Sequence, residues 1–190
     1  MESTGPQQQA KTSKAELIAL LQLAYSGERA AAYAYRGHWH SVSNPAERDH
    51  IKQIEDEEWH HRRLVGEMLT SFGSGPNRWR EWRATVIGRV LAIGCHMIGW
   101  FAPMYGAGKL ESRNIVEYET AARFARDCGR HDLTECLLQM AEVEWEHEHY
   151  FRGRVENHKW LKYFALWPAP PPKESIRTSF VTSASSASLR

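Results

Sequence analysis

The 190-residue sequence predicts an all-α fold: a four-helix bundle with an apolar crossover helix between its second and third helices. Apolar residues recur at the helical spacing of three and four in the segments assigned to the bundle. Two of these segments carry the same Glu-x-x-His motif, at Glu58/His61 and at Glu144/His147. Turn and cap residues divide the bundle segments into two pairs, so each pair should form an antiparallel hairpin.

The bundle is expected to span residues 13–166. Residues 1–12 are polar, lack the apolar stretch of a signal peptide, and are expected to be a disordered lead-in. From Trp167 the chain runs through several prolines, which cannot continue a helix, into a Ser-rich end. We therefore expect residues 167–190 to be a disordered tail.

The first two helices should flank the turn-rich segment 39–45. On the first helix an apolar stripe leads to Glu28, and on the second a stripe leads to Glu58 and His61. The two stripes are Leu17, Leu20, Leu21 and Ala24, and Ile51, Ile54, Val65, Met68 and Phe72. Glu28 and Glu58 are equidistant from residue 43, so they should lie at one level of an antiparallel hairpin.

The crossover segment, residues 84–107, carries Arg89 as its single formal charge. Its length and apolarity approach those of a membrane-spanning helix, but its glycines, His96 and Pro103 weaken that interpretation. The preceding segment, residues 78–83, is rich in Arg and Trp, which suit a lipid headgroup layer. We expect a helix that dips into one leaflet. A buried crossover helix and a spanning helix are the alternatives.

The last two bundle helices should flank the turn around Gly129. Leu133, Leu137 and Met140 lead to Glu144 and His147 on the fourth helix. On the third helix, Glu117 continues a stripe of Leu110, Asn114, Ala121 and Phe124, and it is preferred because the midpoint of Glu117 and Glu144 falls in the turn. Glu119 continues another stripe and remains an alternative.

The register of both motifs is ambiguous, because Glu57/His60 and Glu146/His149 have the same spacing. The apolar stripes favour Glu58/His61 and Glu144/His147. The neighbouring acids Glu142, Glu146 and Glu148 are expected on a solvated face.

A Glu and a His three residues apart project from one helical face, so each motif can offer an oxygen and a nitrogen to one metal. Two such motifs plus one Glu from each remaining helix form the ligand set of ferritin-like di-iron bundles. Buried carboxylates also need a cation nearby. The predicted ligands of two irons are Glu28, Glu58, His61, Glu117, Glu144 and His147, with no catalytic residue beyond them. Manganese suits the same ligands.

Net charge and cysteine content bear on the binding partners and the cellular compartment of the protein. The formal charge of +1 argues against a chain-wide match to nucleic acid. Cys95, Cys128 and Cys136 show no Cys-x-x-Cys spacing, which is typical of reduced thiols in a cytosolic protein. We expect a cytoplasmic protein bound peripherally to the inner leaflet.

Several motifs together resemble the demethoxyubiquinone hydroxylase family of ferritin-like di-iron monooxygenases. They are Ser26-Gly27-Glu28, the Glu58/His61 pair thirty residues later, Val116-Glu117, the string from Glu144 to His147, and the glycine-punctuated apolar segment 86–108. The resemblance covers residues 14–153. Arg123-Phe124 departs from the family's pattern, and the C-terminal segment has no counterpart in it.

The resemblance implies an O2-dependent hydroxylase that acts on a hydrophobic quinone-type ring, demethoxyubiquinol, in ubiquinone biosynthesis. Its partners would be O2, a reductase or NADH as reductant, and a membrane surface, with homo-oligomerisation left open. Two rival functions use the same sequence features. One is a ferritin- or rubrerythrin-like protein that oxidises iron or reduces peroxide, and the other is a metal-free helical adaptor at a membrane surface.

Overall fold

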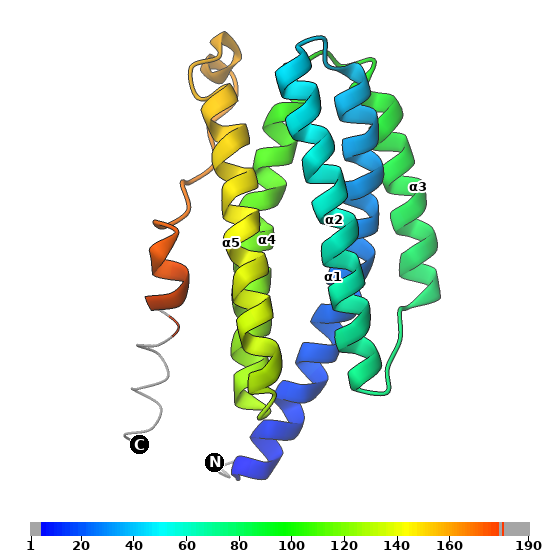
Figure 1. Cartoon of the computed structure of the whole chain (residues 1–190). Coiled ribbons are helices and arrows are strands. Elements are labelled where there is room, and N and C mark those ends of the chain that lie inside the picture. Colours follow the sequence, from blue (N-terminus) through cyan, green and yellow to red (C-terminus); the bar gives the residue numbers. More distant parts are fainter. Residues whose placement is uncertain (1–4, 179, 181–190) are drawn as a thin grey trace. The chain divides into compact units, whose positions relative to one another are not determined.

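The computed structural model describes residues 5–178 and residue 180, and within them every regular element is a helix. This confirms the predicted all-α class, with packed helices as in a helical bundle. The elements are α1 (Pro6–Ser41), α2 (Pro45–Ser71), α3 (Arg78–Cys95), α4 (Phe101–Asp127), α5 (His131–Val155) and the 3-10 helix η1 (Lys159–Lys162). Figure 1 shows these elements along the chain.

The start of α1 differs from the expectation. Residues 6–12, expected as part of a disordered lead-in, belong to this helix, which begins at Pro6. Proline is tolerated there because the first helical turn has no partner for its N–H groups.

The chain forms two compact units. The α1–α3 unit comprises Ile18–Gly106, and the α4–α5 unit comprises Met1–Leu17 together with Ala107–Arg190. Each unit contains an antiparallel helix pair, α1 with α2 in the first and α4 with α5 in the second (Figure 1).

The loop of the first hairpin is Val42–Asn44, centred on residue 43 as predicted. Asn44 caps α2, because its side-chain oxygen accepts hydrogen bonds from the backbone N–H groups of Ala46 and Glu47. This cap fixes where α2 begins and therefore the level at which its side chains meet those of α1.

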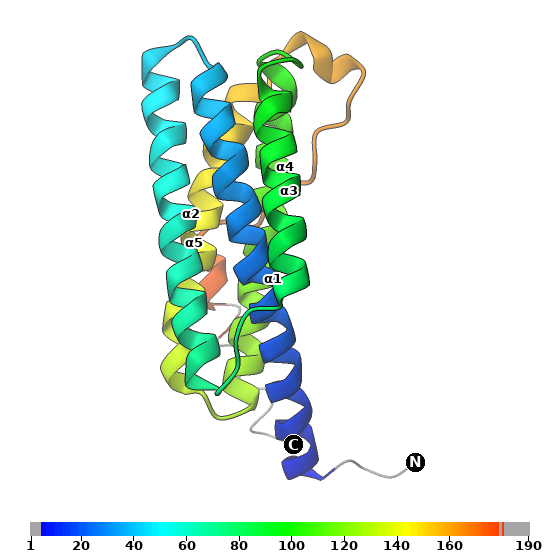
Figure 2. The same ribbon diagram turned by 90° about the vertical axis from the view of Figure 1, so that its right-hand side faces the viewer.

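Helix α3 lies along α1, as Figure 2 shows. The contact is close because small residues meet there. A Cβ on Gly88 would lie 2.6 Å from the carbonyl oxygen of Ala30, and one on Gly37 would lie 2.3 Å from the Cα of Ala92. A larger side chain at either glycine would force the two backbones apart.

Away from its contact with α1, much of the surface of α3 is apolar and exposed, and we call this surface the α3 apolar face. Of the α3 residues, only Ala84 and Gly88 are buried. The apolar face and its continuation consist of Trp79, Trp82, Val86, Ile87, Val90, Leu91, Ile93, Met97 and Ile98. The alternative of a buried crossover helix is therefore wrong for α3, because its large apolar side chains are exposed. Among the described residues, no helix has the length and apolarity to cross a membrane.

In the α4–α5 unit the hairpin turns at Cys128–Arg130, where Gly129 has a φ of 78°. The buried stripe of α4 recurs at spacings of three and four: Gly108, Glu111, Ile115, Tyr118, Ala122 and Ala125. Leu110, expected on the inward stripe with Glu117, is 41% exposed. The inward face of α4 thus differs from the face that the sequence favoured.

Residues 167–178, which we call the C-terminal strap, pack along α5 instead of forming the expected disordered tail. Trp167 and Ile176 are buried, and residues 174–178 form a helical turn. The part of the expected tail at 181–190 lies outside the described residues.

Candidate metal centre

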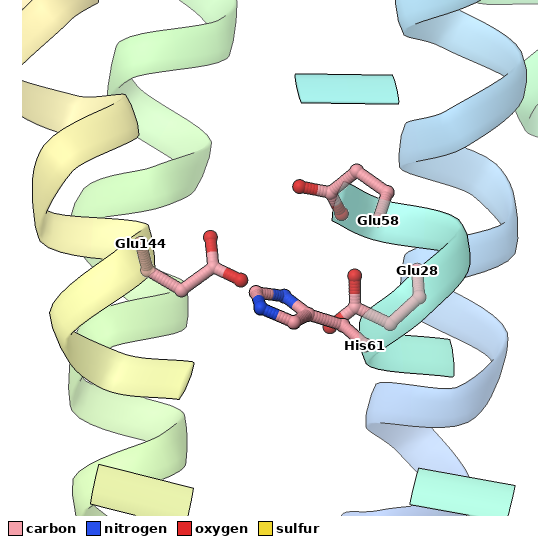
Figure 3. A group of neighbouring side chains, drawn as sticks. All are labelled: Glu28, Glu58, His61 and Glu144. Carbon is pink, nitrogen blue, oxygen red and sulfur yellow. The ribbon is translucent and has the colours of Figure 1, made fainter. Parts of the chain in front are cut away.

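The α1–α3 unit brings three predicted ligands together. Glu28 comes from α1, and Glu58 and His61 come from α2. One potential ligand atom from each residue lies within 4.8 Å of those of the other two, and all three side chains are almost fully buried. Figure 3 shows them projecting from their helices into a common region; it also draws Glu144, which belongs to the other unit.

A charged network borders this triad. Glu81, near the start of α3, accepts hydrogen bonds from the Ser26 hydroxyl and the Arg29 guanidinium, both at 2.9 Å, and from Arg62 at 3.2 Å. Ser26 and Arg29 flank Glu28, and Arg62 follows His61. The N-terminal part of α3 is therefore bonded to the neighbours of the α1 and α2 ligands.

The electrostatics of Glu81 follow from these contacts. Burial alone would raise the pKa of its carboxyl group, but the hydrogen bonds from Arg62, Arg29 and Ser26 outweigh burial and lower it. Arg29 in turn has a raised pKa, chiefly because of its hydrogen bond to Glu81. Glu81 is thus held as a carboxylate beside two guanidinium groups.

The α4–α5 unit contains a second triad of the same composition: Glu111 from α4, and Glu144 and His147 from α5. Their potential ligand atoms also lie within 4.8 Å of one another, and both carboxylates are fully buried. The side-chain amide of Asn114 donates to Glu111 at 2.8 Å and to Glu144 at 3.4 Å. His147 Nδ1 lies 3.7 Å from a carboxylate oxygen of Glu144.

The third-helix ligand differs from the sequence-based choice, because the structure brings Glu111 into this triad and leaves Glu117 half-buried outside it. Six residues of α-helix correspond to a rotation of about 600°, so Glu117 is turned about 120° away from Glu111. Glu119, the alternative, is also half-buried, and burial raises the pKa of its carboxyl group.

Glu111 was missed because the midpoint with Glu144 favoured Glu117, and the stripe that Glu117 continues runs through the exposed Leu110. The spacing of Gly108, Glu111, Ile115 and Tyr118 is the signal that could have found it.

The competing motif pairs do not enter either triad. His60, Glu146 and His149 are exposed, and Glu57 is half-buried and accepts a hydrogen bond from Gln53. Within each motif the structure therefore buries the residues that the apolar stripes favoured.

Each triad suits a hard divalent cation. Two carboxylates and one imidazole are the ligands that non-haem iron and manganese accept in proteins. A pair of buried carboxylates is also costly without a compensating cation. The donor sets therefore fit metal binding on their chemistry.

Comparison with known proteins identifies the family. The family model described as ubiquinone biosynthesis protein COQ7 matches residues 15–112, just over half of the chain. The chain belongs to the COQ7 family. No curated protein and no solved structure gave a match.

The COQ7 match covers the whole triad of the α1–α3 unit and, near its end, Glu111. Glu144, His147 and the C-terminal strap lie beyond the matched segment. Family membership links the chain to ubiquinone biosynthesis and implies a quinone substrate and a di-iron enzyme.

Proposed function

We propose that this COQ7-family chain is an O2-dependent di-iron monooxygenase that hydroxylates demethoxyubiquinol, a hydrophobic quinone-type ring, in ubiquinone biosynthesis. The observation that carries the proposal is the pair of buried Glu-Glu-His triads, one in each unit, in a chain of this family. Neither triad contains the serine, threonine or cysteine nucleophile that many hydrolases activate with a neighbouring base.

Each triad would supply the ligands of one of the two irons that the family implies. Glu28, Glu58 and His61 would hold one iron, and Glu111, Glu144 and His147 the other. This assignment rests on the matching donor sets and on the family, and it replaces Glu117 by Glu111. Four carboxylates would offset the charge of two Fe(II) ions.

Bound iron would supply the activation of O2 and the redox change that hydroxylation requires. The chain's own residues would hold and shield the centre. Complete burial of Glu58, Glu111 and Glu144 keeps bulk water from their carboxylates, which strengthens electrostatic interactions there. Asn114 donates to two of the ligand carboxylates, so it would orient them for the metal.

A hydrophobic quinone resides in lipid, so the enzyme needs access to a membrane surface. We assign that contact to the α3 apolar face, which would make the chain peripheral to the membrane. A groove of about 420 Å³ runs beside this face, between α1 and α3, and its lining includes Arg80 and Arg83 as well as Leu23 and Ile87. Guanidinium groups next to exposed apolar side chains suit an anionic lipid headgroup layer.

Two observations disfavour the rival functions. A rubrerythrin-like protein would need a four-cysteine module, and the chain has three cysteines without paired spacing. A metal-free adaptor would have no use for two sets of fully buried carboxylates. The electrons for hydroxylation would come from a reductase or from NADH.

Metal content and product formation test the proposal. We expect about two irons per chain in protein expressed with iron. With O2 and NADH, added with and without a reductase, we expect conversion of a demethoxyquinol to a product one oxygen atom heavier. A Glu58→Gln, Glu144→Gln double variant is the control and should lose iron while remaining helical. A folded wild-type chain without metal would refute the enzyme and leave the adaptor as the better explanation. Iron binding without hydroxylation would favour the ferritin-like alternative.

A further inference from the structure

The C-terminal strap contacts the residues of α5 that surround Glu144 and His147. The indole N–H of Trp145 donates to the carbonyl of Pro171 at 2.8 Å, and Lys173 forms an ion pair with Glu146. These α5 residues directly follow Glu144 and precede His147. The strap lies beyond the segment matched by the COQ7 family, so its role must be sought in this chain itself.

Trp167 is the buried anchor at one end of the strap. Its indole N–H donates to the carboxylate of Glu148 at 2.6 Å, and Arg152 donates to the same carboxylate at 2.8 Å. Arg152 also donates to the carbonyl groups of Trp167 and Pro168. Glu148 is 1% exposed and adjoins His147 in the sequence. The three side chains therefore form a closed hydrogen-bonded network next to a ligand.

The indole ring also reaches α4. A Cβ on Gly108 would lie 2.4 Å from Cζ2 of Trp167 and 2.9 Å from the Cβ of Phe151. Gly108 precedes Glu111 by three residues, and Phe151 follows His147 by four. Each is thus one helical turn from a ligand and on the same face. Trp167 therefore packs against both helices at the turn next to the triad.

The other end of the strap is held separately. Arg177 bonds to Glu142 at 2.5 Å and to Glu135 at 2.7 Å, and Ile176 beside it is buried. Side chains at this end can be changed without touching the Trp167 network.

We propose that Trp167 is a positioning residue of the metal centre. Its N–H bond to Glu148 and its ring contact with Gly108 fix the spacing of α4 and α5 where Glu111 and His147 leave their helices, and this spacing sets metal affinity. The proposal rests on the proposed function, because it requires the α4–α5 triad to bind metal.

Cobalt(II) titration of metal-free full-length protein tests this role, since the visible spectrum of Co(II) reports the geometry of its ligands. Trp167→Phe removes the N–H donor but keeps a ring. Gly108→Ala displaces the ring of Trp167, and also meets Phe151, without substituting any residue of the strap. Each variant should bind one of two Co(II) ions about tenfold more weakly and with an altered spectrum, the usual size for residues that orient ligands. Arg177→Met is the matched control: it should lower the melting temperature but leave Co(II) affinity and spectrum unchanged.

The outcomes separate the two proposals. If wild type binds two Co(II) ions and both Trp167→Phe and Gly108→Ala bind them with wild-type affinity and spectrum, Trp167 has only a structural role and the inference is overturned. If wild type itself binds no Co(II), the proposed function fails first and the inference falls with it. Should Trp167→Phe fail to fold, Gly108→Ala alone decides.

Discussion

Replacing Glu111 by Gln should have opposite effects on the metal-free and the metal-loaded protein, whereas replacing Glu117 should affect neither. Glu111 is fully buried, and its ligand atom lies within 4.8 Å of those of Glu144 and His147. Glutamine keeps the size of the side chain, and its carbonyl oxygen can still accept the hydrogen bond from Asn114. The substitution thus isolates the loss of one negative charge.

The magnitude follows from the geometry. The potential ligand atoms of Glu111 and Glu144 lie no more than 4.8 Å apart, and at that limit, with an effective dielectric constant of 20, two unit charges repel by about 3 kcal/mol. In metal-free protein, Glu111→Gln relieves this repulsion from Glu144, so the free energy of unfolding should rise by up to about 3 kcal/mol. With metal present, the same change removes a charged ligand, so one of the two metals should be lost.

Urea unfolding of chelator-treated protein at neutral pH measures the first effect, and iron content after reconstitution measures the second. We expect a higher urea midpoint and about one iron fewer for Glu111→Gln. The half-buried Glu117→Gln serves as the matched control and should equal wild type in both assays. The reasoning would be refuted if Glu117→Gln lost iron and Glu111→Gln kept it. Glu117, the residue favoured by the midpoint spacing, would then be the ligand on α4.

Two further predictions concern other parts of the chain. Burial lowers the pKa of His38 to about 4. As pH falls from about 6.5 to 4, the unfolded chain binds a proton that the buried imidazole does not, so the free energy of unfolding should fall by about 3 kcal/mol in all. Urea unfolding at several pH values should show this loss in wild type and not in His38→Gln; equal profiles would contradict it. A Val90→Asp, Ile93→Asp double variant should no longer float with anionic vesicles, whereas Val116→Asp, at an exposed site on α4, should float like wild type. Equal flotation of all three proteins would remove the α3 apolar face as the membrane contact.

The first hairpin could be predicted from the sequence because two independent signals agree there. The apolar stripes place Glu28, Glu58 and His61 inward, and the turn residues place the loop centre at residue 43. The structure has the loop at Val42–Asn44 and buries all three side chains. An Asn cap followed by proline leaves little freedom for the start of α2, so the register is set locally.

The ligand on α4 could not be decided by the midpoint argument. The observed loop is centred on Gly129, whereas the midpoint with Glu144 is 127.5 for Glu111 and 130.5 for Glu117. Both candidates are therefore equally far from the centre. The two candidates differ only in the face of α4 on which they lie. The predicted stripe ran through Leu110, which is exposed, so it lay on the wrong face. Single exposed apolar residues are ordinary on protein surfaces, so one leucine is a weak guide to an inward face.

The environment of α3 likewise could not be predicted from its amino-acid composition. The sequence shows an apolar, glycine-punctuated segment, but it does not show which side is covered. Gly37 and Gly88 allow α1 and α3 to approach closely, and of the α3 residues only Ala84 and Gly88 are buried. The larger apolar side chains then remain outside that contact, which is the arrangement expected where a lipid surface covers them.

The C-terminal strap was predicted to be disordered from its composition, and its contacts with α5 show why that prediction was wrong. Glu142, Glu146 and Glu148 were expected on a solvated face. Glu146 is exposed as expected, but Glu142 is half-buried and Glu148 is buried, and the three accept hydrogen bonds from Arg177, Lys173 and Trp167 of the strap. Either segment alone suggests solvent exposure, because acids on a helix and prolines in a tail are both common at surfaces. Proline restricts the unfolded chain, so ordering such a segment costs less backbone entropy than ordering a flexible tail of equal length. Two buried apolar side chains and several charge-assisted hydrogen bonds can then offset that cost. A Pro-rich segment that carries indole and cationic groups should therefore be tested for pairing with acidic helix faces before it is assigned to disorder.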